Sequence, residues 1–225
     1  MGWTIAQHGN GIWARKAYTK DRKQDITNWG SHDFRLAVLQ PLQCEETLTL
    51  EGTYALLTEI IRDNDNAYLY RGLPIQAYDE EGIFYSKHSS NFHDSASRQF
   101  QLDLDFQEPS LDIKVSLEDR VEVALKHLPF LEGCRFIAQL SSSCGIALIE
   151  YPKLKEYRRR LCLRLWIEAE RAYTGAELSH YFKNYIEAGL VDSAMFEPSR
   201  IHNVLPGLVG GKPLHAIEES IRLYA

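Results

Sequence analysis

The segment QFQLDLDF, residues 99–106, alternates apolar and polar side chains without interruption. Successive side chains of an extended chain point to opposite faces, so the pattern predicts a β-strand with one apolar face. The other face carries Gln101, Asp103 and Asp105. This segment is therefore expected to form a strand with one apolar face and one acidic face.

The rest of the chain mixes helical and extended patterns. Apolar residues at helical spacing predict two helices, residues 51–63 and 117–127, and Thr53 is the expected N-cap of the first. A capping box, Thr174 to Glu177, opens a third helix. Further strands are expected at residues 67–71, 135–140 and 161–167. Short strands and loops are expected in residues 1–45, a loop in 85–97 and a turn in 209–213. This order predicts an α+β domain around a mixed or antiparallel sheet.

The size of the chain bounds its organisation. With 225 residues, 44% of them hydrophobic and 25% charged, it has the composition of an ordinary soluble globular protein. We expect one domain over residues 1–225, with two closely packed lobes at residues 1–98 and 99–225. No apolar run approaches the roughly 18 residues that span a bilayer, and the N-terminus does not resemble a secretory signal. The expected location is the cytoplasm.

Cysteines and net charge exclude some classes of site. The four cysteines form no CxxC pair, so buried thiols are expected rather than a zinc site. A net charge of −6 argues against a uniformly basic surface. A local basic stretch can still contact a nucleic-acid backbone, and the candidate residues are Lys153, Lys155, Arg158, Arg159 and Arg160. The alternative interpretation of this stretch is a solvated face beside a strand.

Asp103 and Asp105 are the first candidate metal ligands. Two residues apart on a strand, their side chains share a face at a separation of roughly 6–7 Å. Two carboxylates that close are favoured by a cation between them, and an all-oxygen site suits Mg²⁺ or Mn²⁺. A third carboxylate is expected from the strand that contains Glu168 and Glu170, if that strand is a neighbour. A solvated strand face is the alternative for each of these acids.

The segment SSSCG, residues 141–145, follows the strand expected at residues 135–140. Hydroxyls and exposed backbone N–H groups in such a turn can bind phosphate oxygens. It is not a Walker A loop, because no Gly-Lys-Ser/Thr follows. The alternative is a plain polar turn.

Five segments together resemble the archaeo-eukaryotic primase superfamily, and in particular the primase-polymerase domains of plasmids, phages and mobile elements. In chain order they are NAYLYRG, FQLDLDF, HLPFLEGCRFIAQLSSSCGI, RLCLRLWIEAERAYTGAEL and VDSAMFEPSRIHNVLPGLVGGKPL. They extend over about residues 54 to 214. The second resembles the strand-borne DxD motif of the family, the third its Ser-rich motif, and the fourth its third-motif strand.

The resemblance implies a primase-polymerase fold with an RNA-recognition-motif-like catalytic sheet and a flanking α/β lobe. It implies Asp103 and Asp105 as metal ligands, and Glu170, with Glu168 as the alternate, as the third carboxylate. The implied nucleotide-binding residues are Ser141, Ser142, Ser143, Gly145 and Arg164. Arg164 stands near the position where the family often has a phosphate-binding histidine.

The implied activity is that of a DNA-dependent primase or polymerase, a nucleotidyltransferase that uses two Mg²⁺ or Mn²⁺ ions in plasmid or mobile-element replication. Its partners would be nucleoside triphosphates, a single-stranded or primed DNA template and a helicase, in the same or a neighbouring chain. One alternative is a primase-like nucleic-acid-binding or replication-initiation domain with weakened chemistry. The other is a two-metal nuclease, since carboxylates alone do not distinguish water from a 3′-hydroxyl as the attacking group.

Overall fold

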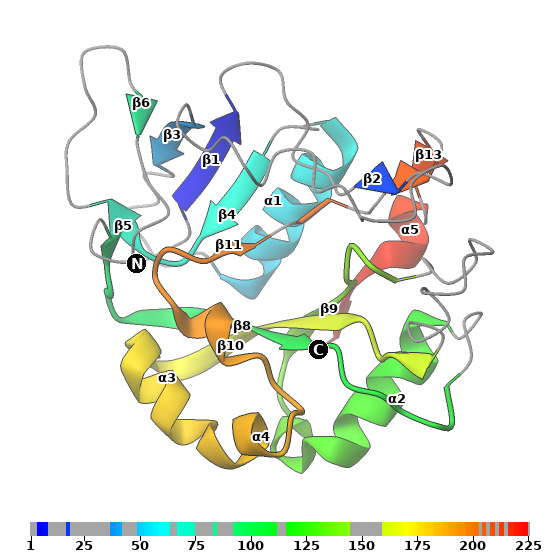
Figure 1. Cartoon of the computed structure of the whole chain (residues 1–225). Coiled ribbons are helices and arrows are strands. Elements are labelled where there is room, and N and C mark those ends of the chain that lie inside the picture. Colours follow the sequence, from blue (N-terminus) through cyan, green and yellow to red (C-terminus); the bar gives the residue numbers. More distant parts are fainter. Residues whose placement is uncertain are drawn as a thin grey trace.

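The structure is a computed structural model that describes residues 4–8, 17–18, 37–41, 49–63, 67–74, 83–84, 92–111, 116–144, 159–202, 204–205, 208–209, 212–213 and 216–224. It is a mixed α/β structure with a four-stranded antiparallel sheet and several helices, which agrees with the expected α+β class. Figure 1 shows this sheet in the middle of the molecule, with one group of helices below it and a second sheet above it. No helix among the described residues is both long and apolar enough to cross a membrane.

The central sheet has the strand order β14-β9-β10-β8. Its strands are β8 (Ser97–Leu104), β9 (Phe136–Leu140), β10 (Leu163–Tyr173) and β14 (Ile221–Tyr224). All three pairings are antiparallel, and β10 lies between β8 and β9. The strand expected at 99–106 is therefore present, shifted by two residues toward the N-terminus.

The apolar face of this sheet packs on the lower helices, which are α2 (Leu117–His127), α3 (Gly175–Tyr181) and α4 (Lys183–Glu187) (Figure 1). Leu102 and Leu104 of β8 are completely buried in this core. The bounds of α2 are those expected from apolar spacing. The capping box of α3 is also present, because the Thr174 side chain accepts from the Glu177 N–H and the Glu177 side chain accepts from the Thr174 N–H.

Helix α1 (Leu50–Asp63) covers the opposite face of the sheet. Leu57 and Ile61 of α1 share a core with Ile137 and Trp166 of the sheet. The expected N-cap, Thr53, is wrong by one turn. The Thr49 hydroxyl accepts from the Gly52 N–H at 3.1 Å, so the cap is Thr49. Thr53 lies inside the helix, where its hydroxyl donates to Gln99 Oε1 on β8 at 2.7 Å.

The upper half of the molecule also contains a five-stranded sheet of order β11-β4-β1-β3-β6, which lies beside α1 in Figure 1. Its strands are β1 (Thr4–His8), β3 (Ala37–Pro41), β4 (Ala67–Tyr70), β6 (Ile83–Phe84) and β11 (Ile201–His202). The remaining strands are short: β2 (Ala17–Tyr18) lies parallel to β12 (Leu208–Val209), which pairs with β13 (Lys212–Pro213), and β5 (Leu73–Pro74) pairs with β7 (Phe92–His93).

The chain crosses the expected division into lobes 1–98 and 99–225. Strand β11 pairs with β4, so residues 201–202 belong to the upper sheet. Strand β14 then returns to the central sheet beside β9, after a short helix, α5 (Ile217–Ser220). The upper and lower halves are therefore built from interleaved segments of the chain. His202 of β11, in the upper sheet, contacts Gln101 of β8, in the central sheet.

Glu108, four residues after β8, provides a pH-dependent contact. Hydrogen bonds from the Ser110 N–H and hydroxyl, and from His127, lower the pKa of Glu108 from 4.5 to about 2. A carboxyl with a lowered pKa in the folded state stabilises the fold above its unfolded pKa, and this contribution is lost as pH falls toward 2. We expect the Glu108→Gln variant to lose less stability than the wild type between pH 4.5 and pH 2, as measured by urea unfolding at each pH. Parallel curves for the two proteins would contradict this assignment.

Candidate functional site

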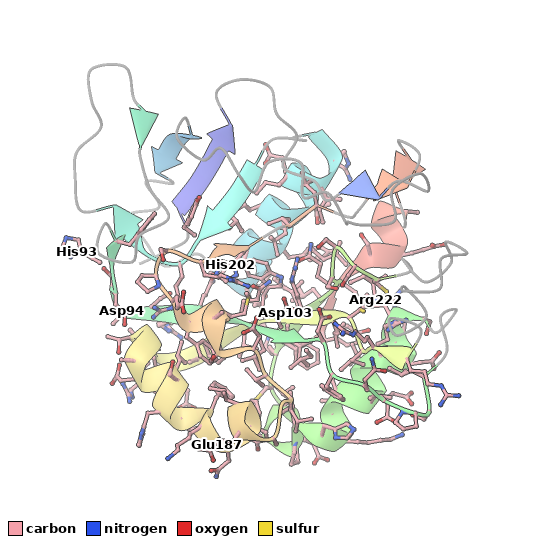
Figure 2. All side chains as sticks on the ribbon, viewed as in Figure 1. His93, Asp94, Asp103, Glu187, His202 and Arg222 are labelled. Atoms are coloured by element: carbon pink, nitrogen blue, oxygen red, sulfur yellow. The ribbon has the colours of Figure 1, made fainter. Side chains whose placement is uncertain are left out.

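The central sheet brings Arg164 next to Asp103. In the β10–β8 register Arg164 is directly opposite Asp103, and its Nε lies 3.5 Å from Asp103 Oδ2. Both side chains are nearly buried, with exposed fractions of 6% for Arg164 and 12% for Asp103. Figure 2 shows Asp103 near the middle of the molecule, between the upper half and the lower helices. The guanidinium provides a permanent positive charge beside this carboxylate.

The next row of the sheet contains Asp105, Cys162 and Ser141. The ladder continues past β10, since Leu161 N–H donates to Phe106 O and Gln107 bridges Arg160. Ser141 N–H donates to Cys162 O at 2.8 Å. The same register therefore carries Asp105 and Ser141 to either side of Cys162. The DxD strand and the strand before the serine turn therefore finish at the same end of the sheet.

Cys162 has an unusual backbone conformation, with φ of 49°. This is the left-handed region, which a residue with a side chain adopts only when its surroundings hold it there. Arg120 of α2 does so from below, since its Nη1 donates to Arg160 O at 2.9 Å and to Leu161 O at 2.6 Å. Burial, followed by the negative charge of Asp105, raises the pKa of the Cys162 thiol. The Cys162 thiol is therefore buried and neutral at this site.

The serine turn is more enclosed than its sequence suggests. Ser141, Ser142 and Ser143 are all buried. The hydroxyls of Ser141 and Ser143 lie 2.9 Å apart, and the Ser143 hydroxyl donates to Cys162 Sγ at 3.8 Å. In this arrangement the hydroxyls of Ser141 and Ser143 support the Cys162 row. Their contact with a phosphate stays a prediction, and Gly145 lies outside the described residues.

Glu168 and Glu170 do not join the two aspartates. Strand β10 is a neighbour of β8, as expected, but Glu168 is opposite Gln99 in the antiparallel register. Gln99 is four residues from Asp103, a separation of about 13 Å along a strand. Glu170 lies farther along β10, beyond a shift in register. The sequence places these acids on a neighbouring strand without giving the register, and the register moves them to the other end of the sheet.

Asp192 is the acid whose backbone adjoins Asp103. Its N–H donates to Asp103 O at 3.2 Å, along the free edge of β8. Its carboxylate caps the 3-10 helix η6 (Ser193–Phe196), where Oδ1 accepts from the Ala194 N–H at 2.9 Å. Oδ2 lies 3.7 Å from Nη2 of Arg200, and both side chains are 45% exposed. The sequence pattern identified Asp192 only as part of the closing segment.

The expected acidic face is a buried polar layer. Gln101 of β8 accepts from the Nδ1–H of His202 on β11, and Trp166 Nε1–H donates to Gln139 Oε1 at 3.0 Å. His202 is buried, and Figure 2 labels it near the centre of the molecule. Burial, followed by the charges of Arg164, Arg200 and Arg71, lowers the pKa of His202 well below 6.5, so the ring is neutral. Strand alternation predicted polar side chains here, but their burial depends on the long-range return of β11.

A divalent ion fits these residues only in part. Asp103 and Asp105 supply two carboxylates, and Asp105 Oδ1 is buried without a hydrogen-bond partner among the described residues. Within the described part of the chain, no three histidine, cysteine, aspartate or glutamate side chains form a group that could hold a metal ion. A third carboxylate therefore requires a side-chain rearrangement.

The basic stretch is described only at its end. Arg159 is exposed, and Arg160 is partly buried in its bridge with Gln107. Lys153, Lys155 and Arg158 lie outside the described residues, so their contact with a nucleic-acid backbone stays a prediction.

Comparisons with known proteins identify no family for the chain. A scan against protein-family models, a search of curated proteins and a search of solved structures each found no match.

Proposed function

We propose that the chain is a metal-dependent nucleotidyltransferase of the primase-polymerase type, with Asp103 and Asp105 at its catalytic centre. The observation that supports this best is the sheet register. It assembles a carboxylate pair, a buried arginine and the serine turn at one end of the sheet. Those are the groups that phosphoryl transfer requires, since its catalysis consists of positioning and charge stabilisation.

The proposed fold family agrees with the architecture at a coarse level. A four-stranded antiparallel sheet carries the candidate residues, and helices α2 and α3 cover one of its faces. An RNA-recognition-motif sheet is also four-stranded. In the proposal, the upper five-stranded sheet together with α1 would be the flanking α/β lobe.

In this proposal Asp103 and Asp105 would hold a divalent ion, and Asp192 is the candidate third carboxylate. Bound there, Mg²⁺ or Mn²⁺ would lower the pKa of an attacking hydroxyl and neutralise phosphate charge. Asp192 is chosen over Glu170 because its backbone is hydrogen-bonded to Asp103, whereas the β10 register carries Glu170 away. Its carboxylate would have to leave the Ala194 N–H to reach the pair.

The residues of the chain have separate roles in the proposal. Arg164, a permanent cation beside Asp103, would orient a triphosphate oxygen. Arg120 would keep the backbone before Cys162 in place through its two carbonyl contacts. Arg159 and Arg160, with the basic residues before them, would contact the template backbone.

A second candidate is a primase-like nucleic-acid-binding domain without chemistry. The observation that favours it is the ion pair between Arg164 and Asp103, which already neutralises one of the two carboxylates. The absence of a three-acid group among the described side chains agrees with this candidate as well. The two candidates differ in whether a divalent ion binds at Asp103 and Asp105.

Manganese binding separates the two candidates. We expect Mn²⁺ to raise the melting temperature of the wild type, and a nucleoside triphosphate to raise it further, because both bind the folded state. Asp103→Asn/Asp105→Asn should lose both shifts. Asp192→Asn should weaken the Mn²⁺ shift while keeping the cap, since an amide oxygen still accepts from Ala194. The matched control Glu168→Gln/Glu170→Gln should keep both shifts. A wild type that Mn²⁺ does not stabilise would favour the binding module.

A further inference from the structure

A concave site lies at the end of the central sheet that is distant from Asp103. A pocket of about 330 Å³ opens between β10, helix α3 and the 3-10 helix η3 (Pro129–Leu131). Its volume is at the lower end of the range of ligand sites, roughly 300–1,000 Å³. None of the residues assigned to the proposed catalytic centre lines it.

Five of the eleven lining residues are aromatic. Among them, the ring centroid of Phe182 lies 5.7 Å from that of Phe100 and 5.4 Å from that of Phe130. Tyr181 and Tyr173 also line the pocket. Tyr181 is 61% exposed. Among the residues that the structure describes, no other large hydrophobic side chain is exposed. An exposed tyrosine beside an aromatic pocket provides a ring for a ligand to contact.

Two carboxylates give the pocket its charge. Glu168 and Glu170 both contribute to the lining. Arg98 partly balances Glu168, with Nη2 3.4 Å from Oε1. Glu170 is exposed and makes no ion pair with any residue in the described part of the chain. The pocket therefore combines ring faces with an unbalanced negative charge.

Next to the pocket, the guanidinium of Arg171 lies over the ring of Tyr173, a lining residue. The Arg171 Cζ lies 3.8 Å from the centroid of the Tyr173 ring, and Arg171 Nη1 also reaches Glu177 Oε1 at 3.2 Å. A ring face with a neighbouring carboxylate is the environment that attracts organic cations. Arg171 is thus a cation held by a tyrosine ring and a carboxylate. The pocket lining offers a second tyrosine ring and a second carboxylate, those of Tyr181 and Glu170.

We infer that this pocket binds an organic cation with an apolar body, either free or as the arginine side chain of a peptide. The apolar body would lie against the partly exposed rings of Phe130 and Tyr173, over the buried rings of Phe100 and Phe182. The cation would lie between the Tyr181 ring and the Glu170 carboxylate. The size of the pocket limits the ligand to a small molecule or a single side chain. The inference is independent of the proposed function, because the pocket and the aspartates are at different ends of the sheet.

Cys134 provides a readout located at the site itself. Its thiol lines the pocket and is exposed, whereas Cys144 and Cys162 are buried. The rate of Cys134 alkylation by iodoacetamide, followed by peptide mass spectrometry, would be measured against increasing probe concentration. The probes are phenyltrimethylammonium, as a free cation, and N-acetyl-arginine amide, as a side chain. N-acetyl-citrulline amide is the neutral match of the arginine probe.

We expect one or both cations to slow Cys134 alkylation saturably, and the citrulline probe to bind at least about fivefold more weakly. Glu170→Gln and Tyr181→Ala should each weaken the cations by about two- to fivefold, and Tyr181→Phe should not. Glu122→Gln, the same charge change on the exposed side of α2, is the control. Protection by citrulline equal to that by arginine, or no protection by either cation, would overturn the inference. An unchanged Glu170→Gln variant would overturn it as well.

Discussion

Replacement of Arg71 by methionine is expected to lower the free energy of unfolding by about 3–5 kcal/mol, because it removes a cation from a buried network. The side chain of Arg71 is 2% exposed, and Nη1 pairs with Asp94 at 2.5 Å. Nη2 donates to Tyr173 O at 2.8 Å, and Nη1 also reaches Phe196 O at 3.4 Å. These contacts join β4, the entrance to β8, the end of β10 and η6.

Asp94 extends the same network to α3. Its carboxylate accepts from the Gly175 N–H at 2.7 Å and from the Ala176 N–H at 3.1 Å, at the start of the helix. Burial raises the pKa of Asp94, but the contacts with Arg71, Gly175 and Ala176 outweigh it and hold the pKa below 3.8. The methionine variant would leave this carboxylate without its cation. Figure 2 shows Asp94 where β8 and α3 begin.

Thermal unfolding measures this effect directly. For a chain of this length, a loss of 3–5 kcal/mol corresponds to a decrease in melting temperature on the order of 10 °C. Arg135→Met is the matched control, since Arg135 pairs with Glu51 at the surface and both side chains are at least half exposed. Exposed ion pairs contribute little, so this variant should melt close to the wild type. Equal melting temperatures for the two variants would show that the Arg71 network does not stabilise the fold.

Local patterns predicted much of the fold. Apolar spacing gave the bounds of α2, and the capping box at Thr174 predicted the start of α3. The alternation around Asp103 predicted both the strand and the apolar side of β8. In each case the structure depends on residues close in sequence, for which spacing is sufficient information.

The candidate site depended on information that local patterns do not contain. The register of β10 against β8 decides that Arg164, and not Glu168, is opposite Asp103. The two carbonyls that precede the left-handed Cys162 accept from Arg120, about 40 residues away in the chain. The burial of Gln101 depends on His202, 101 residues later. Such pairings are fixed by tertiary packing, so the sequence could identify the candidate side chains but not their neighbours.

The proposed nucleotidyltransferase activity depends on Asp103 and Asp105 as the ligands of the catalytic metal. Asp103→Asn/Asp105→Asn is expected to abolish nucleotide incorporation, because a two-metal reaction needs the carboxylates that bind its ions. Asparagine is close in shape to aspartate, and loss of the Asp103 charge leaves Arg164 buried without its partner carboxylate. Circular dichroism of the variant is therefore required to show that the fold persists.

Incorporation of labelled nucleotides into single-stranded and primed DNA templates, with Mn²⁺ present, measures this dependence. We expect extension by the wild type and by Glu168→Gln/Glu170→Gln, which loses two carboxylates at the other end of the same sheet. We expect no extension by the folded Asp103→Asn/Asp105→Asn variant. Extension by that variant at the wild-type rate, or shortening of the template by the wild type in place of extension, would contradict the proposed role of the two aspartates.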